Sequence, residues 1–269
     1  MCIRDSPNVA APLSNLATLY YQRGDYEKAE PLYKRALAIV EKSLGPEHTN
    51  VALSLYNLAI LYNDKGEYSK AEPLYQRALA IREKALGPEH PDLAGSLTNL
   101  GLLYYYKGEY SKAEPLYLRA LDIAEKWLSP EHSDLARALN NLALLYRNRG
   151  DYAKAEPLYK RALDIAEKSL GPEHTNITPH LNNLALLYYY KGEYSKAEPI
   201  SQRALAIREK ALGPEHPSVA NSLNSLAILY YQRGEYSKAE PLFRRALAIA
   251  EKSLGPEHPQ TVLSLRNLV

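Results

Sequence analysis

The chain has 269 residues, and its 33 Lys and Arg nearly balance its 31 Asp and Glu, which leaves a net charge of +2. Charges of both signs are interspersed and form no basic stripe that would attract phosphate backbones, so we expect no nucleic-acid partner. The only cysteine is Cys2, no apolar run approaches the roughly 18 residues that span a bilayer, and residues 1–6 lack a signal-peptide core; we therefore expect a cytoplasmic protein with no membrane partner.

The first helix is predicted after a short leader. Residues 1–6 do not match the corresponding parts of later segments, and we interpret them as an artefactual leader outside the fold. From about Asn8 onward, apolar and small residues recur at positions i, i+3, i+4 and i+7, which is the spacing of one helix face. The predicted buried face consists of Leu13, Leu16, Ala17 and Tyr20.

A second helix is predicted directly after Gly24, a residue type that commonly ends helices. If this helix begins near Tyr26, then Pro31 lies in its second turn, where proline removes a backbone hydrogen bond at a cost of roughly 3 kcal/mol. Either the helix carries Pro31 with a small bend, or regular helix begins nearer Pro31. We favour the first interpretation, because Tyr26 and Ala29 extend the apolar stripe upstream. Gly45, followed by proline, should end the second helix.

This two-helix pattern repeats every 42 residues, as from Gly24 to Gly66, and a Gly-Pro-Glu-His sequence closes each repeat, with Ser129 once replacing the glycine. A fixed period of this length indicates stacked structural repeats. Residues 7–269 should form one array of six helix pairs that divide near residues 48, 90, 132, 174, 216 and 258, plus a truncated seventh first helix. Thr49, Ser133 and Thr175 are the expected N-caps of three first helices.

The repeats resemble tetratricopeptide repeats, which carry small and aromatic residues at fixed offsets. The matching positions in the second repeat are Leu58, Ala59, Tyr62, Gly66, Tyr68, Ala71, Tyr75 and Ala78. The period exceeds the usual 34 residues by eight, and residues 81–90 hold the addition; this longer form is similar to the kinesin light chain subtype. The resemblance implies an all-α, right-handed α-solenoid whose concave groove is lined by first helices.

An asparagine ladder is the first candidate for a binding surface. With the apolar stripe buried, the opposite side of each first helix carries an asparagine in five of the six repeats. These residues are Asn15, Asn57, Asn99, Asn141 and Asn183, with Asn267 in the seventh first helix and Ser225 as the exception. A side-chain amide can donate to and accept from a peptide backbone of any sequence, and the resemblance implies the same role. Alternatively, these amides bond only to neighbouring helices.

Aromatic and other large side chains form a second row on the same face. They are Tyr21, Asn63, Tyr105, Arg147, Tyr189 and Tyr231. Tyrosine and arginine are typical of binding hot spots, although packing between repeats would explain the same pattern. Few charges line this predicted groove, since the second helices carry most of them on what should be a solvated outer face. We therefore expect a ligand with apolar or aromatic side chains rather than one held by its carboxylate.

Two further features have plain structural explanations. A histidine recurs once per repeat, as at His48 and His90, but equivalent atoms of successive repeats should lie roughly 8–10 Å apart, too far to share a metal ion. Capping or loop packing fits better, and we expect no metal. In the fifth repeat Ser201 replaces a tyrosine and should leave the helix pair underpacked. This position is either a local weak point or a place that a partner fills; we favour the weak point.

Catalysis finds no support in the sequence, which lacks a phosphate-binding glycine loop, an H-E-x-x-H motif, a nucleophile elbow and a Cys–His pair. The sequence therefore predicts a non-catalytic protein–protein interaction scaffold that binds an extended or helical peptide segment in its groove, with no cofactor and no small-molecule substrate. The alternative is a regulatory or sensor arm of a larger bacterial signalling or effector protein whose catalytic domain lies outside this chain.

Overall fold

The computed structural model describes residues 7–255, 257–258, 261–262 and 265, and all regular elements in these residues are helical. The α-helices are α1 (Ala10–Gln22), α2 (Tyr26–Leu44), α3 (Thr49–Asp64), α4 (Tyr68–Leu86), α5 (Leu93–Tyr106), α6 (Tyr110–Trp127), α7 (Ser133–Asn148), α8 (Tyr152–Leu170), α9 (Thr178–Tyr190), α10 (Tyr194–Leu212), α11 (Pro217–Gln232) and α12 (Tyr236–Leu254). Short 3-10 turns η2 (Pro7–Val9) and η3 (Thr175–Ile177) precede α1 and α9. In this part of the chain, none of the helices combines the length and apolar character needed to span a bilayer.

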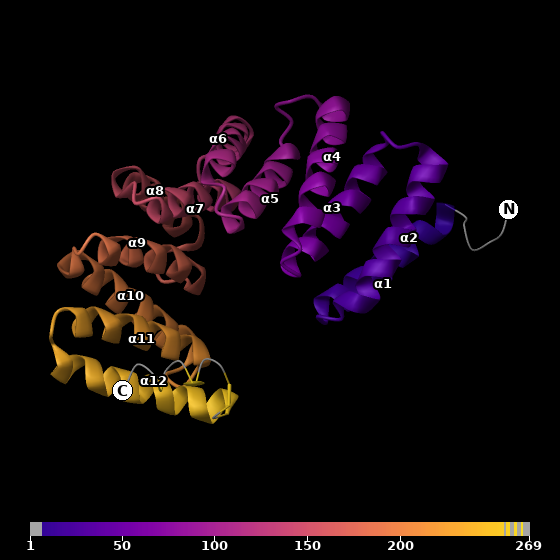
Figure 1. The fold of residues 1–269 in the computed structure, drawn as a ribbon. Coiled ribbons are helices and arrows are strands. Elements are labelled where there is room, and N and C mark those ends of the chain that lie inside the picture. The colour runs from indigo at the N-terminus through magenta and orange to yellow at the C-terminus, as the bar shows by residue number, and fades with distance from the viewer. Residues whose placement is uncertain (1–6, 256, 259–260, 263–264, 266–269) are drawn as a thin grey trace. The chain divides into compact units, whose positions relative to one another are not determined.

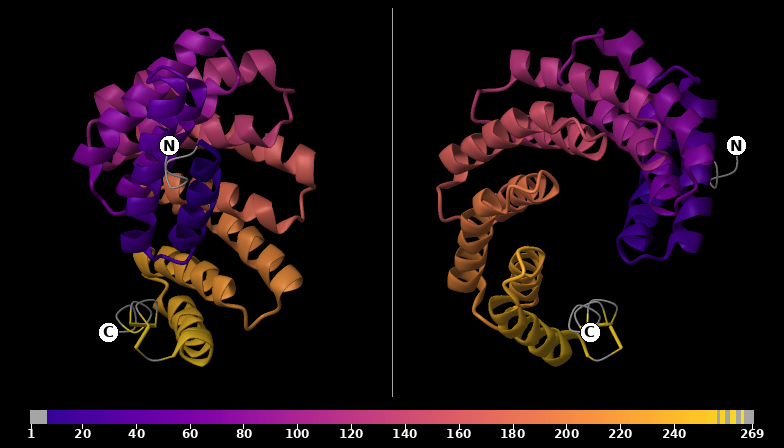
Figure 2. Two further views of the ribbon diagram at one scale, coloured as in Figure 1. Left: turned by 90° about the vertical axis from the view of Figure 1, so that its right-hand side faces the viewer. Right: turned by 60° about the vertical axis from the view of Figure 1, so that its left-hand side comes forward.

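Consecutive helices form six pairs, from α1 with α2 to α11 with α12 (Figures 1 and 2). The chain divides into two compact units, Met1–Leu128 and Ser129–Val269, and each contains three pairs. Within a unit, the second helix of one pair also packs against the first helix of the next pair, as α2 packs against α3 and α8 against α9. The predicted all-α stacking of helix pairs is confirmed. Of the predicted seventh first helix only residues 261–262 and 265 are described, all helical, and Asn267 lies outside the described residues.

Each first helix ends in a turn that only glycine forms easily. Gly24 has a φ of 79°, and its N–H donates to the Tyr21 carbonyl at 2.9 Å. The next N–H, of Asp25, donates to the Tyr20 carbonyl at 2.9 Å. This pair of bonds is a Schellman motif, which satisfies carbonyls at the helix end and reverses the chain into the second helix. The same bonds recur at Gly66, where the N–H donates to Asn63.

The second helices end at a glycine with a different backbone conformation, and Ser129 shows why that glycine recurs. Gly45 has φ 85° and ψ 158°, a region open essentially to glycine alone. In the third repeat Ser129 stands in place of the glycine, and α6 ends one residue earlier in the repeat, at Trp127. Leu128 then continues the chain in an extended conformation, with φ −102° and ψ 153°. The helix in this repeat is thus one residue shorter, and the extended Leu128 takes the place of the glycine turn.

Burial between repeats accounts for most of the apolar core. Leu58 is 3% exposed and Leu226 is 4% exposed, whereas their counterpart Leu16 in α1 is 41% exposed. The expected burial of Leu16 was therefore wrong. The helices α3 and α11 pack against the second helix of the preceding pair, and no such helix precedes α1 among the described residues. A single pair cannot bury both of its apolar sides, as is general for repeat proteins.

The prediction that the second helix carries its proline is confirmed. α2 runs from Tyr26 to Leu44 with Pro31 inside it, and α4, α8, α10 and α12 contain the equivalent proline. Pro31 is exposed on the outer side of α2, so its ring does not displace core side chains. Packing of the whole helix against two neighbours outweighs the one backbone hydrogen bond that proline removes.

Recurrent histidines cap α3, α7, α11 and the turn η3, and His90 makes the same bond just before α5. His48 Nδ1 accepts a hydrogen bond from the N–H of Asn50 at 3.1 Å, and His90, His132, His174 and His216 accept equivalent bonds. The expected caps at Thr49, Ser133 and Thr175 were wrong, since Thr49 and Ser133 are already the first residues of their helices. A ring nitrogen that accepts must be unprotonated, so the neutral side chain makes this cap. Capping, rather than metal binding, explains one histidine per repeat.

Replacing His48 with Ala should lower the free energy of unfolding by about 0.5–2 kcal/mol, because the Asn50 N–H at the start of α3 loses its acceptor. His48→Asn keeps a good capping side chain and should retain most of the stability. The free energy of unfolding of the two variants and of the original chain is measured by chemical unfolding. Equal losses in the two variants would show that the ring contributes packing and not a cap.

Candidate functional site

The predicted site residues all lie on the first helices, and we call the side that carries them the first-helix face. In the first unit they are Asn15, Asn57, Asn99, Tyr21, Asn63 and Tyr105; in the second unit they are Asn141, Asn183, Arg147, Tyr189 and Tyr231, with Ser225 at the asparagine position. Asn15, Ser225 and Tyr231 are exposed, and the other residues of these two rows are half-buried. The face is therefore open to solvent along each unit, and its side chains are partly ordered by packing.

The asparagines differ in how far the protein already uses their amides. Asn99 donates to the hydroxyl of Tyr56, which lies on the preceding first helix, α3. Asn183 donates to Asn140 Oδ1 on α7 through a long contact of 3.4 Å. The side chains of Asn57 and Asn141, by contrast, make no hydrogen bond within the described residues. Bonding to neighbouring helices thus accounts for two of these amides and leaves two half-buried amides free.

A polar cluster extends the Asn183 contact in the second unit. Asn140 Nδ2 donates to the Ala136 carbonyl at 3.0 Å and also lies 2.5 Å from His180 Nδ1 on α9. Burial lowers the pKa of His180, which favours its neutral ring. A neutral ring can accept at Nδ1, as this contact requires.

The row of large side chains consists of ring contacts and one cation. Tyr189 lies beside Tyr190 and Tyr194, with ring centroids 5.6 and 5.8 Å away, and Tyr231 lies 5.3 Å from Tyr236. The Arg147 guanidinium lies 5.6 Å from the centroid of Tyr190, across from α7 to α9. Such pairs prefer edge-on and tilted arrangements and hold the rings in place. Apolar ring surface is thus presented beside the amides.

Two members of this row mainly serve contacts within the protein. The Tyr21 hydroxyl donates to the Asp64 carboxylate on α3, and burial followed by this bond raises the pKa of Tyr21. Asn63 donates to Asp64 at 3.3 Å, while its own Oδ1 is buried without a hydrogen-bond partner in the described part of the chain. These contacts make the end of α1 and α3 more rigid than the sequence pattern suggested.

Two arginines that the sequence analysis placed on the outer face instead reach the first helices. Arg82 on α4 donates to Ser96 Oγ on α5 at 2.6 Å, and its guanidinium lies 5.0 Å from the Tyr56 ring centroid. Arg208 on α10 donates to Ser222 Oγ on α11 at 2.5 Å, and burial lowers its pKa. Only these two repeats have arginine at this position, where the others have valine or alanine. That departure from the repeat was the available signal.

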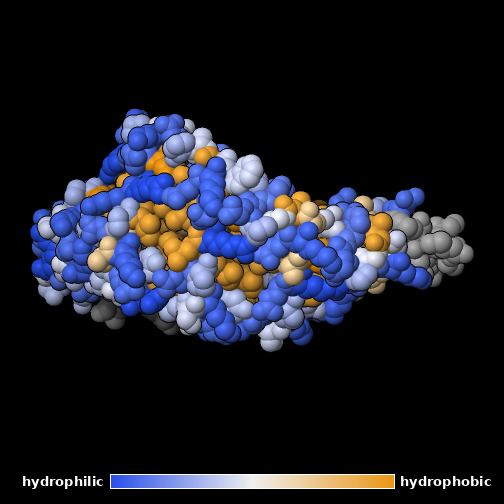
Figure 3. Space-filling model, turned by 90° about the horizontal axis from the view of Figure 1, so that it is seen from above, coloured by the Kyte–Doolittle hydropathy of each residue, from blue (hydrophilic) through white to orange (hydrophobic). Residues whose placement is uncertain are grey.

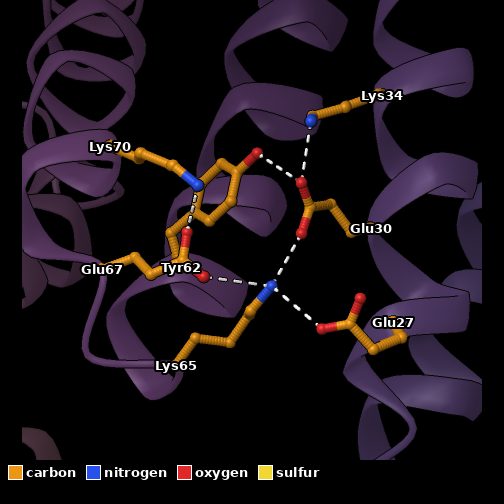
Figure 4. Close-up of polar contacts among 7 residues, drawn as sticks. All are labelled: Glu27, Glu30, Lys34, Tyr62, Lys65, Glu67 and Lys70. Atoms are coloured by element: carbon orange, nitrogen blue, oxygen red, sulfur yellow. Dashed lines mark hydrogen bonds and ion pairs between the residues drawn. The ribbon is translucent and has the colours of Figure 1, made fainter.

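The glutamate of each Glu-Pro joins one repeat to the next, a role that the sequence analysis did not assign. Glu30 on α2 accepts from the Tyr62 hydroxyl at 2.9 Å and from Lys65 Nζ at 2.8 Å, both from the second repeat (Figure 4). We call this arrangement the inter-repeat clamp. It recurs with the glutamates Glu72, Glu156 and Glu198, which pair with Tyr104 and Lys107, with Tyr188 and Lys191, and with Tyr230 and Arg233. The constant spacing of these residues was the signal.

A second set of contacts joins successive second helices. Arg77 on α4 donates to Glu41 on α2 at 2.6 Å and to the carbonyl of Pro46 at 3.0 Å. Arg203 makes the same two contacts, with Glu167 and Pro172. In the space-filling view of Figure 3, hydrophilic side chains cover most of the visible face and hydrophobic residues show in smaller areas between them. The contacts of Arg77 and Arg203 show that some charged side chains of the second helices hold repeats together.

A pocket of about 340 Å³ opens in the second unit, between α9, α10 and α11. Its lining includes Asn183 and Tyr189 of the predicted site, together with Tyr190, Ser201 and Ser225. Asn182 also contributes, and with its amide turned so that the oxygen faces Arg208, it accepts from that guanidinium at 3.0 Å. The predicted underpacking at Ser201 therefore coincides with a pocket on the first-helix face.

Comparison with known proteins gives a consistent family match. A family model described as tetratricopeptide repeat matches residues 8–84, 59–126, 134–210 and 177–252, and a second model with that description matches residues 98–169. A search of curated proteins gives no match.

Solved structures with similar folds include two at more than a quarter identity. BtubC (BKLC) from P. vanneervenii is 27% identical with a TM-score of 0.69, and the match covers 90% of this chain and 94% of that one. A putative kinesin light chain from P. anserina, with nearly identical TPR-like repeats, is 29% identical with a TM-score of 0.69, over 77% and 99% of the two chains. A third structure is a signal transduction ATPase with numerous domains from Pyrococcus horikoshii, which has a tetratricopeptide repeat sensor. It is 21% identical with a TM-score of 0.75, and the match covers 99% of this chain and 38% of that one. At this identity the likeness shows the fold alone.

The inter-repeat clamp makes a prediction about acid stability. Hydrogen bonds from Lys160 and then Lys191 hold the pKa of Glu156 at about 2, below its ordinary 4.5. Since the folded pKa is depressed, the stabilisation is complete above about pH 4.5, shrinks as the pH falls, and is lost near pH 2. Glu156→Gln should therefore lower the free energy of unfolding by about 1 kcal/mol near neutral pH and by almost nothing near pH 2, measured by urea unfolding.

Glu240 provides the matched control for this experiment. It occupies the same position in the sixth repeat, but its side chain is 60% exposed and pairs with Arg244 on its own helix. Glu240→Gln should change stability by only a few tenths of a kcal/mol at neutral pH, as exposed pairs of this spacing do. A loss at Glu156 that persists unchanged at pH 2, or that Glu240→Gln reproduces, would contradict a contribution of the clamp contacts of Tyr188 and Lys191, beside that of Lys160, to the lowered pKa.

Proposed function

Because the chain belongs to the tetratricopeptide repeat family, whose members generally bind protein partners and are generally non-catalytic, we propose that it is an interaction scaffold. Its ligand is an extended or helical peptide segment of a partner protein, and the first-helix face receives it. The observation that carries this proposal is the pair of half-buried amides of Asn57 and Asn141, one in each unit, which make no hydrogen bond within the described residues.

The chemistry of these amides suits a peptide backbone. A half-buried amide loses part of its contact with water, so a hydrogen bond to a ligand gains more there than on an open surface. Each amide offers two N–H donors and one acceptor oxygen, which matches the donor and acceptor that every residue of an extended segment presents. The interaction would be independent of the ligand's sequence, and the neighbouring rings would supply selectivity.

The tyrosines beside the ladder favour apolar and aromatic ligand side chains. Tyr105 and Tyr189 are half-buried against other rings, so their faces are held in place before a ligand arrives, which reduces the entropy lost on binding. Arg147 is stacked on Tyr190, and Arg82 and Arg208 are engaged with serines, so these cations already have partners. This arrangement supports hydrogen bonding and ring contacts more than capture of a ligand carboxylate.

A sensor or regulatory arm of a larger signalling protein is the second candidate. The ATPase from Pyrococcus horikoshii is described as having a tetratricopeptide repeat sensor, and the match to this chain covers 38% of that protein. Such an arm would use the same binding face, and the two candidates differ in what the bound segment controls. A kinase or ATPase activity encoded in the same gene would favour the sensor arm.

Changing Asn57 and Asn141 together to Ala should weaken peptide binding about 5-fold, since a peptide on the first-helix face of either unit loses one amide bond that contributes about 1 kcal/mol. Peptides of about 12 residues selected against the original chain from a random library serve as ligands, and fluorescence anisotropy gives their Kd. Helicity and Tm should stay unchanged, because neither side chain bonds to the described protein.

Asn50 and Asn176 supply a matched control, since they are equivalent to each other, exposed, and placed one in each unit just after the capping histidine. Only their backbone N–H groups take part in the caps, so Asn50→Ala with Asn176→Ala removes two exposed side-chain amides seven residues before the ladder positions Asn57 and Asn183. Peptide affinity should not change in this control. If both double variants bind the selected peptides as the original chain does, the peptides bind elsewhere and the assignment of the face is wrong.

A further inference from the structure

The second helices of this chain carry an aromatic ring at one buried position in every repeat except the fifth. The residues are Tyr33, Tyr75, Tyr117, Tyr159 and Phe243, each at most 5% exposed, and Ser201 stands at the same position on α10. A serine side chain fills only a small part of the volume of a phenol ring. The fifth repeat therefore lacks one large core side chain that the others share.

The third repeat shows what that ring touches. A Cβ placed on Gly101 of α5 would lie 2.8 Å from the ring of Tyr117, so the ring lies directly on this small residue of the first helix. Burial raises the pKa of Tyr117, and Tyr105 and Tyr106 lie close enough to add to that rise. The ring thus packs on the small residue of the first helix, near the two consecutive tyrosines at the end of that helix.

The fifth repeat keeps every one of these neighbours and lacks the ring. Ala185, Tyr189 and Tyr190 are the counterparts of Gly101, Tyr105 and Tyr106, and all three line the pocket of about 340 Å³ next to Ser201. Ala185 is 5% exposed, whereas Ala59 and Ala143 at the same position are fully buried. The structure has therefore not collapsed into the vacated space. We call this space the Ser201 pocket.

The Ser201 pocket opens on the first-helix face and has a polar group at its base. Asn183 and Ser225 line it, and Ser225 replaces the ladder asparagine with a smaller side chain at this point. Ser201 itself is only 4% exposed, and its Oγ makes no hydrogen bond within the described residues. This hydroxyl is not among the fully buried polar atoms without a partner and lines the pocket, so water reaches it, and a ligand group that bonds to it takes the place of that water.

We propose that the Ser201 pocket binds a tyrosine side chain of the partner's peptide segment, a proposal that rests on the function proposed above. The incoming ring takes the place that Tyr117 occupies in the third repeat, between Ala185 and the rings of Tyr189 and Tyr190. It enters from the first-helix face, so its hydroxyl reaches inward, toward Ser201 Oγ. A tyrosine side chain forms a hydrogen bond with Ser201 Oγ, whereas a phenylalanine side chain fills the same space without that bond.

The direct test uses p-cresol, which is the tyrosine side chain as a free molecule, and toluene as its counterpart without the hydroxyl. NMR titration of the original chain should show saturable binding of p-cresol at about millimolar concentration, with shifts at Ala185 and Tyr189. Ser201→Ala keeps the space and removes the hydroxyl, so it should weaken the binding of p-cresol about 5-fold and leave the binding of toluene unchanged. Ser201→Tyr fills the space with the protein's own ring and should weaken both at least 10-fold.

Two measurements separate the pocket from an unfolding artefact. Ser201→Tyr should raise Tm, because it restores the packing of the other repeats, so its loss of binding cannot come from a disordered site. Ser195→Tyr adds the same side chain at an exposed position of the same helix and should leave p-cresol binding unchanged. Absence of saturable binding up to 10 mM, or p-cresol affinity that Ser201→Tyr leaves intact, overturns the proposal.

The selected peptides provide the link to the partner. They should contain a tyrosine whose replacement by alanine weakens binding about 10-fold to the original chain and hardly at all to Ser201→Tyr. Selected peptides that lack such a tyrosine overturn the proposal even if p-cresol binds. So does a dimer of the original chain that Ser201→Tyr abolishes, because the ring would then come from a second copy. The p-cresol assay uses no peptide, so its failure is distinct from failure of the asparagine variants.

Discussion

The contact between each repeat and the next is the interaction on which this structure depends, because one helix pair has an apolar side that it cannot bury by itself. The contrast between Leu16, 41% exposed, and Leu58, 3% exposed, measures what a preceding repeat provides. The inter-repeat clamp lies over this apolar contact. Glu30 reaches Tyr62 and Lys65 only if the two repeats meet in the correct register, and a slipped register would leave this half-buried carboxylate with Lys34 of its own helix alone. Apolar burial thus supplies most of the stability, and the clamp fixes the alignment.

The greater length of this repeat has a comparable explanation. The residues added to the usual repeat length include Glu41, Pro46 and His48 in the first repeat. Glu41 and the Pro46 carbonyl both accept from Arg77 of the next second helix, and His48 caps the next first helix. The addition therefore supplies contacts between successive second helices and a defined start for the following pair. Its residues serve the stacking of repeats, and the first-helix face is left free.

How much the sequence could predict depended on how local each feature is. Helix pairs and their glycine turns were predictable, because apolar spacing and the backbone freedom of Gly24 act within a few residues. Capping by His48 was one of the two roles expected for the recurrent histidines, whereas the clamp was missed because Glu30 and Tyr62 come from different repeats. On the candidate site, the helices and faces were predictable. Which amides are already occupied was not, since Asn99 depends on Tyr56, a neighbour that varies between repeats.

The near identity of the repeats makes the departures in the fifth repeat informative. In a stacked-repeat protein the stability is roughly a sum over repeats and their interfaces, so a packing defect in one repeat weakens mainly its own neighbourhood. The fifth repeat keeps its clamp, in which Glu156 of the fourth repeat meets Tyr188 and Lys191. Its connection to the fourth repeat is therefore intact while its interior is altered. A chain built in this way can carry a side chain chosen for something other than packing at Ser201, because the contacts that align the repeats lie elsewhere.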